Sequence, residues 1–252
     1  HPGLLHSQQD LERIREAIRH KTLPTYDGFK VLRESKYSKH DYRLRGPAVA
    51  WGRAPNIAIG QAADDATAAY QNALMWCITG DKKHATKTAE ILNRWSETHQ
   101  RMVGVDGVLA AGLQGFKFVN AAELLRHTDA GWPEPQAVRC ERWFRNAIYP
   151  KIEHYAHFAN GNWETAALQT NVAIAVYCSD RKMFESTMHY AVNGCGNGSI
   201  PNLVVYDSGQ CQETTRAQHY AQLGLGTLAN AAEIAWNQGV DLYGWNNNRL
   251  MR

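Results

Sequence analysis

The run IGQAADDATAAYQNALMWCITGD at residues 59–81, followed by KKHATKTAEILNRWSETHQ at residues 82–100, decides the fold. In the first run, apolar residues recur at the spacing of one helix face: Ala66, Ala69, Tyr70, Ala73, Leu74 and Cys77. Gly80-Asp81 is a typical helix stop, and Lys82–Gln100 gives a second helical pattern directly after it. The two runs therefore predict a pair of antiparallel helices joined by a tight turn.

The same rhythm continues along the chain. Helices are predicted at 8–19 after the N-cap candidate Ser7, at 116–127, at 135–158 with an interruption at Pro150, at 162–178, at 181–193 and at 214–238. Only Ile200–Gln212 has strand-like content, in Leu203, Val204, Val205 and Tyr206. Successive helix pairs favour an all-α fold, an incomplete α/α toroid of antiparallel helix pairs in one domain over residues 1–252. An ordinary helical bundle is the alternative.

Two segments are expected to be irregular. Residues 24–58 contain prolines and glycines that break any period, interleaved with Tyr42, Arg45, Trp51 and Arg53. A long irregular segment in a compact protein is usually functional, so residues 40–56 are predicted to fold over the active cleft as a lid. Residues 101–114 are predicted to be a Gly-rich loop.

Composition excludes several classes of function. The formal net charge of +3 is too small to argue for nucleic acid, although it suits a site that attracts a polyanion. No run of about 18 apolar residues exists, so no membrane span is expected. The five cysteines form no CxxC pair, so no structural zinc site is expected. The sequence shows no other metal motif, and neither a metal nor a cofactor is predicted.

Two features favour a secreted protein. The chain opens at His1-Pro2-Gly3 without a methionine, which suggests a processed or trimmed N-terminus. Asn197-Gly198-Ser199 is a glycosylation sequon in a Gly-rich region, where we expect an exposed loop. In the same region a disulfide between Cys195 and Cys211 is a candidate, whereas Cys77 and Cys178 are expected to be buried thiols.

Chemistry is concentrated in two segments. The first, Asn160-Gly161-Asn162-Trp163-Glu164, precedes an apolar helix, where an amide can stabilise a carboxylate that gains charge. The second runs from Gln212 to Gly224. Here Arg216 and Tyr220 are four residues apart and would share a helix face, with Gln212 one turn further back. Helix capping and a solvated helix face are the structural alternatives.

Together with these segments, the runs at 65–76, 79–81, 120–123 and 222–236 resemble the alginate-lyase superfamily of polysaccharide lyases, most closely polysaccharide lyase family 38. The resemblance covers about residues 45–250. It implies an α/α toroid that cleaves alginate or a related uronan by β-elimination. It places the neutralising asparagine at Asn162 and the catalytic tyrosine at Tyr220. Relatives continue beyond the position of Arg252, so a C-terminal part could follow.

Two positions depart from better-known relatives. Trp163 stands where those relatives have a catalytic histidine directly after the asparagine. Glu213 stands where they have a substrate-binding arginine, and Arg216 is the candidate replacement. The identity of the base is therefore open.

In a 4-linked uronate, the proton on C5 becomes acidic only when the adjacent carboxylate is neutralised, which amides and an arginine can do. A base then removes H5, and an acid protonates O4. In mannuronate or glucuronate both atoms lie on one face, so Tyr220 could serve both steps with Arg216 as the neighbouring cation. Guluronate needs a second group, for which His219, His157 and His40 are available. Candidate substrate-binding residues are Trp163, Tyr42, Arg45, Arg53, Gln114 and Gln212.

Two other functions compete with a lyase. An inverting glycoside hydrolase on the same toroid would need two carboxylic acids, drawn from Asp64, Asp65, Glu164 and Glu213. A non-catalytic glycan-binding protein would use Trp51, Trp163 and Tyr42 as stacking surfaces.

Overall fold

A computed structural model describes residues 1–205 and 208–252. Its α-helices are α1 (Gln8–Arg19), α2 (Thr25–Glu34), α3 (Ile59–Thr79), α4 (Lys82–Thr98), α5 (Gly107–Ala110), α6 (Phe116–Arg126), α7 (Glu134–Trp143), α8 (Tyr149–Ile152), α9 (Gly161–Tyr177), α10 (Arg181–Asn193), α11 (Ile200–Leu203), α12 (Gln218–Asn237) and α13 (Trp245–Asn248). Short 3-10 turns are η1 (Lys36–Ser38) and η4 (Arg249–Met251), and π-turns are η2 (Ala111–Gly115) and η3 (Phe144–Ile148). Strands β1 (Ala50–Trp51) and β2 (Arg101–Met102) pair in parallel.

The predicted hairpin of α3 and α4 is confirmed. Gly80 adopts a left-handed conformation with φ of 70° and ends α3, and the Asp81 side chain accepts a hydrogen bond from the backbone N–H of Lys83 at 3.0 Å. These two local signals fix the turn, so the apolar stripes of both helices can face the same core.

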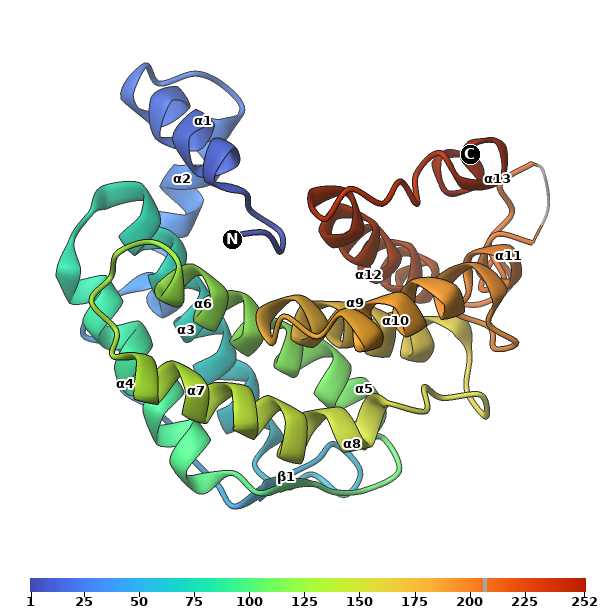
Figure 1. The fold of residues 1–252 in the computed structure, drawn as a ribbon, viewed down its shortest axis with the longest axis horizontal. Coiled ribbons are helices and arrows are strands. Elements are labelled where there is room, and N and C mark those ends of the chain that lie inside the picture. The colour runs from blue at the N-terminus through green and yellow to red at the C-terminus, as the bar shows by residue number, and fades with distance from the viewer. Residues whose placement is uncertain (206–207) are drawn as a thin grey trace.

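The helices form the expected incomplete α/α toroid. α3 packs against α4 and α6, while α9 packs against α10 and α12. Figure 1 shows the helices following an open arc, from α1 and α2 at one end to α12 at the other. The buried apolar residues form one connected cluster. No helix within the described ranges has both the length and the apolar character needed to cross a membrane.

Helix α9 is the central element of this arrangement. All of its residues except Trp163 are buried, because α10, α12 and η2 pack around it. A helix that is buried on every side is typical of a protein interior. The surrounding helices therefore fix α9 in place, and with it the residues at its N-terminus.

Both segments predicted to be irregular contain helix. Residues 25–34 form α2, an exposed helix that packs on α1 and has no buried residue. Residues 101–114 form β2, α5 and most of η2 rather than a loop. Glycine is unfavourable inside a helix. Because of the glycines at 28, 107 and 112, the sequence pattern did not predict helices in these two segments.

Three helix predictions need correction. The helical run from Glu134 ends at Ile152 and passes through Pro150, because the π-turn η3 lies just before the proline. Residues 200–203 form a helical turn, and Val204 makes only an isolated bridge to Cys211; Tyr206 lies outside the described residues. Helix α12 begins at Gln218, so residues 214–217 precede it.

The glycine-rich region around residue 197 also differs from expectation. Cys195 is exposed, Cys211 is buried, and the two are not bonded to each other. Cys77 and Cys178 are buried thiols, as predicted. The Ser199 side chain of the sequon is fully buried, and the Asn197 amide donates a hydrogen bond to the Ala159 carbonyl at 3.0 Å. The sequon therefore lies against the fold rather than on an exposed loop.

Candidate active site

A cavity of about 620 Å³ opens where α9 and α12 begin. The residues that line it come from the β1–α3 connection, the α5–η2 segment, the start of α9 and the start of α12: Arg53, Ile59, Asp106, Leu109, Ala110, Leu113, Gln114, Asn162, Trp163, Arg216, His219, Tyr220 and Leu223. Polar and charged side chains are therefore mixed with apolar ones, so the cavity can bind a polar ligand.

Residues distant in sequence cap the N-terminus of α9. The Gly161 N–H donates to Oε1 of Gln212 at 3.3 Å, and the Asn162 N–H donates to Oε1 of Glu213 at 3.1 Å. A carboxylate is favourable there, because the helix dipole and the free N–H groups attract negative charge. Gly161 is required, since a Cβ atom would lie 2.6 Å from the Asn197 carbonyl oxygen.

A chain of contacts starts at Asn162. Its Nδ2 donates to Oε1 of Glu213 at 2.6 Å, and Nη1 of Arg216 donates to Oε2 of the same carboxylate at 2.5 Å. Glu213 is fully buried, and Asn162 is 1% exposed. Since a carboxylate only accepts hydrogen bonds, Glu213 fixes the orientation of the Asn162 amide, while Arg216 compensates the buried negative charge. Asn162 lies at the buried end of this chain and Arg216 at the exposed end.

Arg216 also contacts Tyr220. Its guanidinium carbon lies 3.9 Å from the centre of the Tyr220 ring, within the range of a cation–π contact. Arg216 precedes α12, so the shared helix face predicted from sequence does not exist, yet the two side chains are adjacent. Among the described residues no protein group hydrogen-bonds the Tyr220 hydroxyl. Its partner can therefore be a bound ligand.

His219 belongs to the same cluster. Its ring centre lies 4.1 Å from that of Tyr220, and both side chains line the cavity. Of the three histidines proposed as a second base, the cavity includes only His219. His157 contacts Oε1 of Glu164 at 3.1 Å, and the ring of His40 packs on that of His84.

The π-turn η2 places Gln114 and Leu113 on the cavity wall. A π-turn leaves a carbonyl without its usual helical partner. Here the Gly112 carbonyl accepts hydrogen bonds from Gln169 Nε2 at 2.9 Å and Thr170 Oγ1 at 2.6 Å, both on α9. A Cβ atom at Gly112 would lie 2.5 Å from the Ala166 backbone. The glycine therefore allows the close packing of η2 on α9.

The segment predicted to be a lid reaches the cavity only through Arg53. Arg53 follows β1, which is anchored by the buried Trp51, and its Nη1 lies 3.6 Å from Oδ2 of Asp106. Tyr42 and Arg45 do not line the cavity. The Tyr42 hydroxyl donates to Oδ1 of Asp65 at 2.8 Å, and the Arg45 guanidinium pairs with Asp64.

Buried Asp65 explains why that part of the segment lies elsewhere. Its carboxylate also accepts from the backbone N–H groups of Arg45 and Gly46 and from Trp95 Nε1, each at 2.9 Å. It therefore ties residues 42–46 to α3 and α4. Burial and this carboxylate raise the pKa of the Tyr42 hydroxyl. Gln212 likewise caps α9 and does not line the cavity.

The acids needed by a hydrolase are not arranged for that reaction. Glu164 is buried, where it accepts from the Gly198 N–H at 2.6 Å and the Tyr190 hydroxyl at 3.0 Å. Asp64, Asp65, Glu164 and Glu213 are absent from the cavity lining. Among the described residues that do line it, Asp106 is the only acid, and it faces Arg53. Inverting hydrolysis requires two carboxyl groups about 6.5–9.5 Å apart in one site.

Sequence reasoning missed the cavity wall formed by Asp106, Leu109, Ala110 and Leu113, because their segment was interpreted as a loop. Glu213 was expected either at the position of a substrate-binding arginine or as a hydrolase acid, and its role as a cap of α9 was not predicted. The sequence feature that could have indicated a helix-capping acid was a carboxylate next to Gln212, just before the polar start of a predicted helix. Its partner at the start of α9 could not be identified without the fold.

Comparisons with known proteins agree with this architecture. Residues 52–252 match the family model described as alginate lyase. No curated protein matches the chain. An alginate lyase A1-III variant with a histidine replaced by alanine, complexed with a tetrasaccharide, has a similar structure: the TM-score is 0.73 at 15% identity, covering 96% of this chain and 72% of that one. An alginate lyase from Bacteroides ovatus gives a TM-score of 0.72 at 14% identity, covering 97% and 79%.

Proposed function

The chain belongs to the alginate lyase family of polysaccharide lyases, and we propose that it cleaves a 4-linked uronic-acid polymer, alginate or glucuronan, by β-elimination. The cavity at the start of α9 and α12 is the proposed site. The observation that carries the proposal is the continuous set of contacts from Asn162 through Glu213 and Arg216 to Tyr220 on one cavity wall.

Neutralisation of the substrate carboxylate is the first requirement. The Glu213 carboxylate takes one N–H of the Asn162 amide and part of the Arg216 guanidinium. In the proposed complex, the second amide N–H and the remaining guanidinium N–H groups bind the substrate carboxylate. Charge-assisted hydrogen bonds of this kind stabilise the extra negative charge that forms when H5 leaves. Because Glu213 holds both donors in place, little reorganisation is needed during the reaction.

Proton transfer is assigned to Tyr220. In its phenolate form the Tyr220 oxygen removes H5; the C4–O4 bond breaks as the C4=C5 double bond forms. The same oxygen then returns the proton to O4 of the departing sugar. The Arg216 guanidinium lies over the ring of this tyrosine. One residue can serve both steps when H5 and O4 lie on the same face, as in mannuronate and glucuronate.

His219 is proposed as the base for guluronate, where H5 and O4 lie on opposite faces. Its ring lines the same cavity as Tyr220, so of the three candidate histidines it is the one that can approach a bound sugar. Trp163, Gln114 and Arg53 are proposed to bind neighbouring sugars: Trp163 offers a ring for stacking and Arg53 a cation for a carboxylate. Because an intact polysaccharide does not cross a membrane, we also propose that the protein is secreted.

The test is incubation of the purified protein with polymannuronate, polyguluronate and glucuronan, following both reducing ends and the ultraviolet absorbance of unsaturated uronate. A lyase releases both signals together, and Tyr220→Phe should abolish both. Reducing ends without the chromophore would establish a hydrolase instead. Binding with neither signal on any of the three polymers would establish a non-catalytic glycan-binding protein.

A further inference from the structure

A second cluster of titratable side chains lies at the other end of α9. Nδ1 of His1 is 2.7 Å from Oε1 of Glu123, and Nε2 of His127 is 3.6 Å from Oε2 of the same carboxylate. The His1 and His127 rings stack with centres 4.3 Å apart. One ligand atom from each of the three residues can be chosen so that all lie within 4.8 Å of one another.

Two atoms of this cluster are buried without a hydrogen-bond partner among the described residues, Oε2 of Glu123 and Nε2 of His127. Glu123 is 1% exposed. A buried polar atom that lacks a partner costs about 1–3 kcal/mol, and more when it is charged. Both atoms are electron-pair donors if the carboxylate is ionised and His127 is neutral at Nε2. A single cation between them would satisfy both.

We propose that His1, Glu123 and His127 bind a divalent transition-metal ion of the zinc type. Two imidazole nitrogens and one carboxylate oxygen are a donor set that Zn²⁺ accepts readily, whereas Ca²⁺ and Mg²⁺ prefer oxygen ligands. The Gly3 N–H donates to Oε1 of Glu123 at 3.0 Å and orients that ligand, as outer partners do in metal sites.

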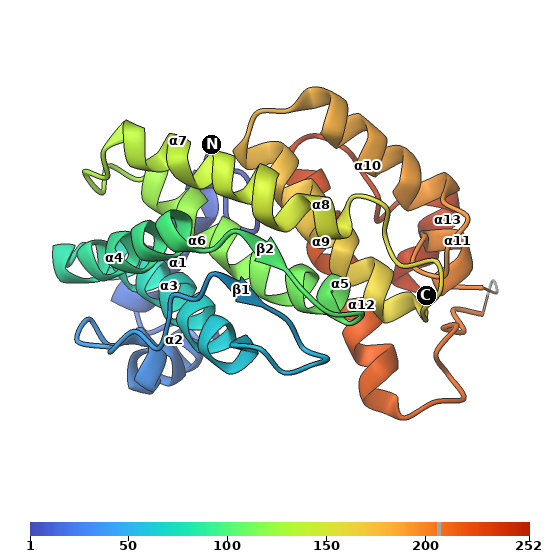
Figure 2. The ribbon, with the colours of Figure 1, turned by 90° about the horizontal axis from the view of Figure 1, so that it is seen from below.

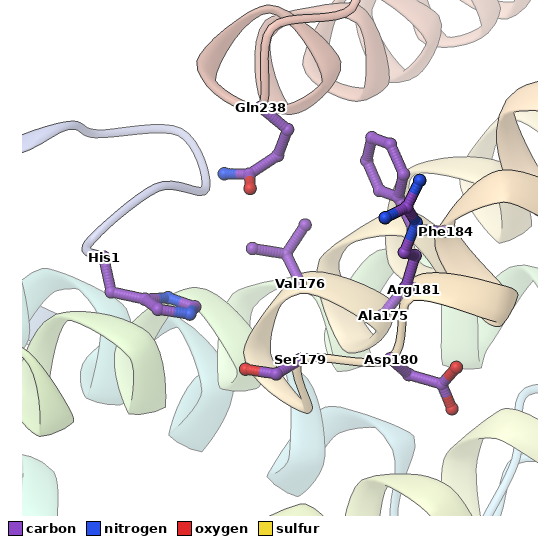
Figure 3. Close-up of a pocket in the computed structure, with 8 residues that line it drawn as sticks. All are labelled: His1, Ala175, Val176, Ser179, Asp180, Arg181, Phe184 and Gln238. Carbon is purple, nitrogen blue, oxygen red and sulfur yellow. The ribbon is translucent and has the colours of Figure 1, made fainter.

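A cavity of about 300 Å³ lies beside the cluster, and His1 is the one of the three proposed ligands that lines it. Figure 3 shows His1 on one side of this cavity, with Gln238 of the α12 end above it and Asp180 across from it. Solvent in the cavity can supply the other ligands. The proposed ion is therefore accessible to exchange with the medium.

The position of the cluster indicates a structural role. Along α9, Asn162 and Ala175 line the two different cavities. At about 1.5 Å per residue they are roughly 20 Å apart, too far for the ion to act on the proposed substrate. The N-terminal segment instead connects two parts of the arc. Gly3 and Leu4 accept hydrogen bonds from Gln238 and Asn237 at the end of α12, while Glu123 lies in α6 and His127 is the C-cap of that helix. A metal ion would fix this connection.

The test is equilibrium dialysis of Zn²⁺ against chelator-treated protein, with a thermal unfolding scan. The wild type should bind one Zn²⁺ per chain, and its Tm should rise by roughly 5–10 °C at a hundredfold excess over Kd. His127→Gln should weaken binding at least about 100-fold, beyond the usual effect of losing an outer partner. Glu123→Gln should do the same if it folds. His154→Gln, an exposed histidine outside the cluster, should bind like the wild type.

The proposal is wrong if the wild type retains no Zn²⁺ above the level of a non-binding control protein, or if His127→Gln binds it as tightly as the wild type. Mg²⁺ at the same concentration should leave Tm unchanged, and an equal rise would indicate a general ionic effect instead. Cleavage of uronans by the wild type should be the same with and without chelator at temperatures well below Tm. This result separates the metal site from the proposed lyase activity.

Discussion

The side-chain amide of Asn162 donates a 2.6 Å hydrogen bond to the buried carboxylate of Glu213, a residue 51 positions away. Glu213 also caps the backbone of α9 and pairs with Arg216. One carboxylate thus fixes the amide and the guanidinium proposed to neutralise the substrate. An acid inside a site for a polyanion is compatible with binding only because Arg216 compensates its charge.

Glu213→Gln tests that positioning role. The change keeps the shape but removes the charge, so the Asn162 amide can turn and Arg216 loses its partner. Loss of a hydrogen bond to a charged group costs about 1.5–3 kcal/mol, which corresponds to a fall in kcat of roughly 10- to 100-fold. KM should not rise, since the site becomes more positive. Glu185→Gln, on the surface at Arg181, is the matched control.

If Glu213 acts only in folding, Glu213→Gln should lower Tm and leave the kcat of the folded fraction unchanged. Steady-state kinetics combined with a Tm measurement on the same sample distinguishes the two roles.

Tyr220→Phe removes only the hydroxyl that is proposed to transfer the proton. The ring and its contact with Arg216 remain, so folding should be nearly unaffected. We expect kcat to fall by at least about 100-fold with little change in KM, because the hydroxyl acts mainly in the transition state. The control is Tyr26→Phe, a half-buried tyrosine on the surface helix α2. Near-normal turnover of Tyr220→Phe on all three polymers would leave Tyr220 a packing residue.

His219→Ala should lower kcat on polyguluronate more than on the other two polymers. If His219 is the opposite-face base, kcat on polyguluronate should fall by about 100-fold or more, while polymannuronate and glucuronan change less than about 5-fold. The measurement is initial rate by ultraviolet absorbance on each polymer, with exposed His154→Ala as control. Equal losses on all three would show that His219 does not act selectively on guluronate.

His99 predicts a pH dependence of stability. Its Nε2–H donates to the Arg101 carbonyl at 2.9 Å, and its Nδ1 accepts from Trp143 Nε1 at 2.9 Å. The second contact requires a neutral ring, because a protonated Nδ1 cannot accept a hydrogen bond. Burial lowers the His99 pKa from 6.5 to about 4. The unfolded state therefore binds more protons than the folded state between pH 6.5 and 4. Stability from this residue is complete above pH 6.5 and is lost as the pH falls to about 4.

The loss would amount to about 3 kcal/mol at pH 4. Denaturant unfolding across this range should show the decline, and His99→Gln, which can donate and accept in the same places, should flatten it. An identical pH profile for both proteins would assign the decline to other groups. The His99 ring packs on Trp51 of β1, and Arg53 follows this strand. Protonation of His99 should therefore also weaken the packing of the segment that carries Arg53.

The sequence by itself determined the α3–α4 hairpin. The apolar period, Gly80 as the helix stop and Asp81 as the next cap all act within a few residues of the turn. The boundaries of α10 and the capping of α1 by Ser7 followed from equally local signals. The proximity of Arg216 to Tyr220 was expected from a short sequence separation and holds, although the helix joining them begins later.

Tertiary structure alone decided which distant groups meet. Tyr42 and Arg45 had the composition of a substrate lid, but buried Asp65 holds them against α3 instead. The sequence does not indicate a partner for Glu213, and only the packing of α9 places Asn162 beside it. Likewise, His1 contacts Glu123, which lies 122 positions away in the sequence. Short-range backbone preferences are fixed by neighbouring residues. Contacts between remote side chains depend on how whole helices pack, because a buried charge or polar group must find its partner wherever the completed core places one.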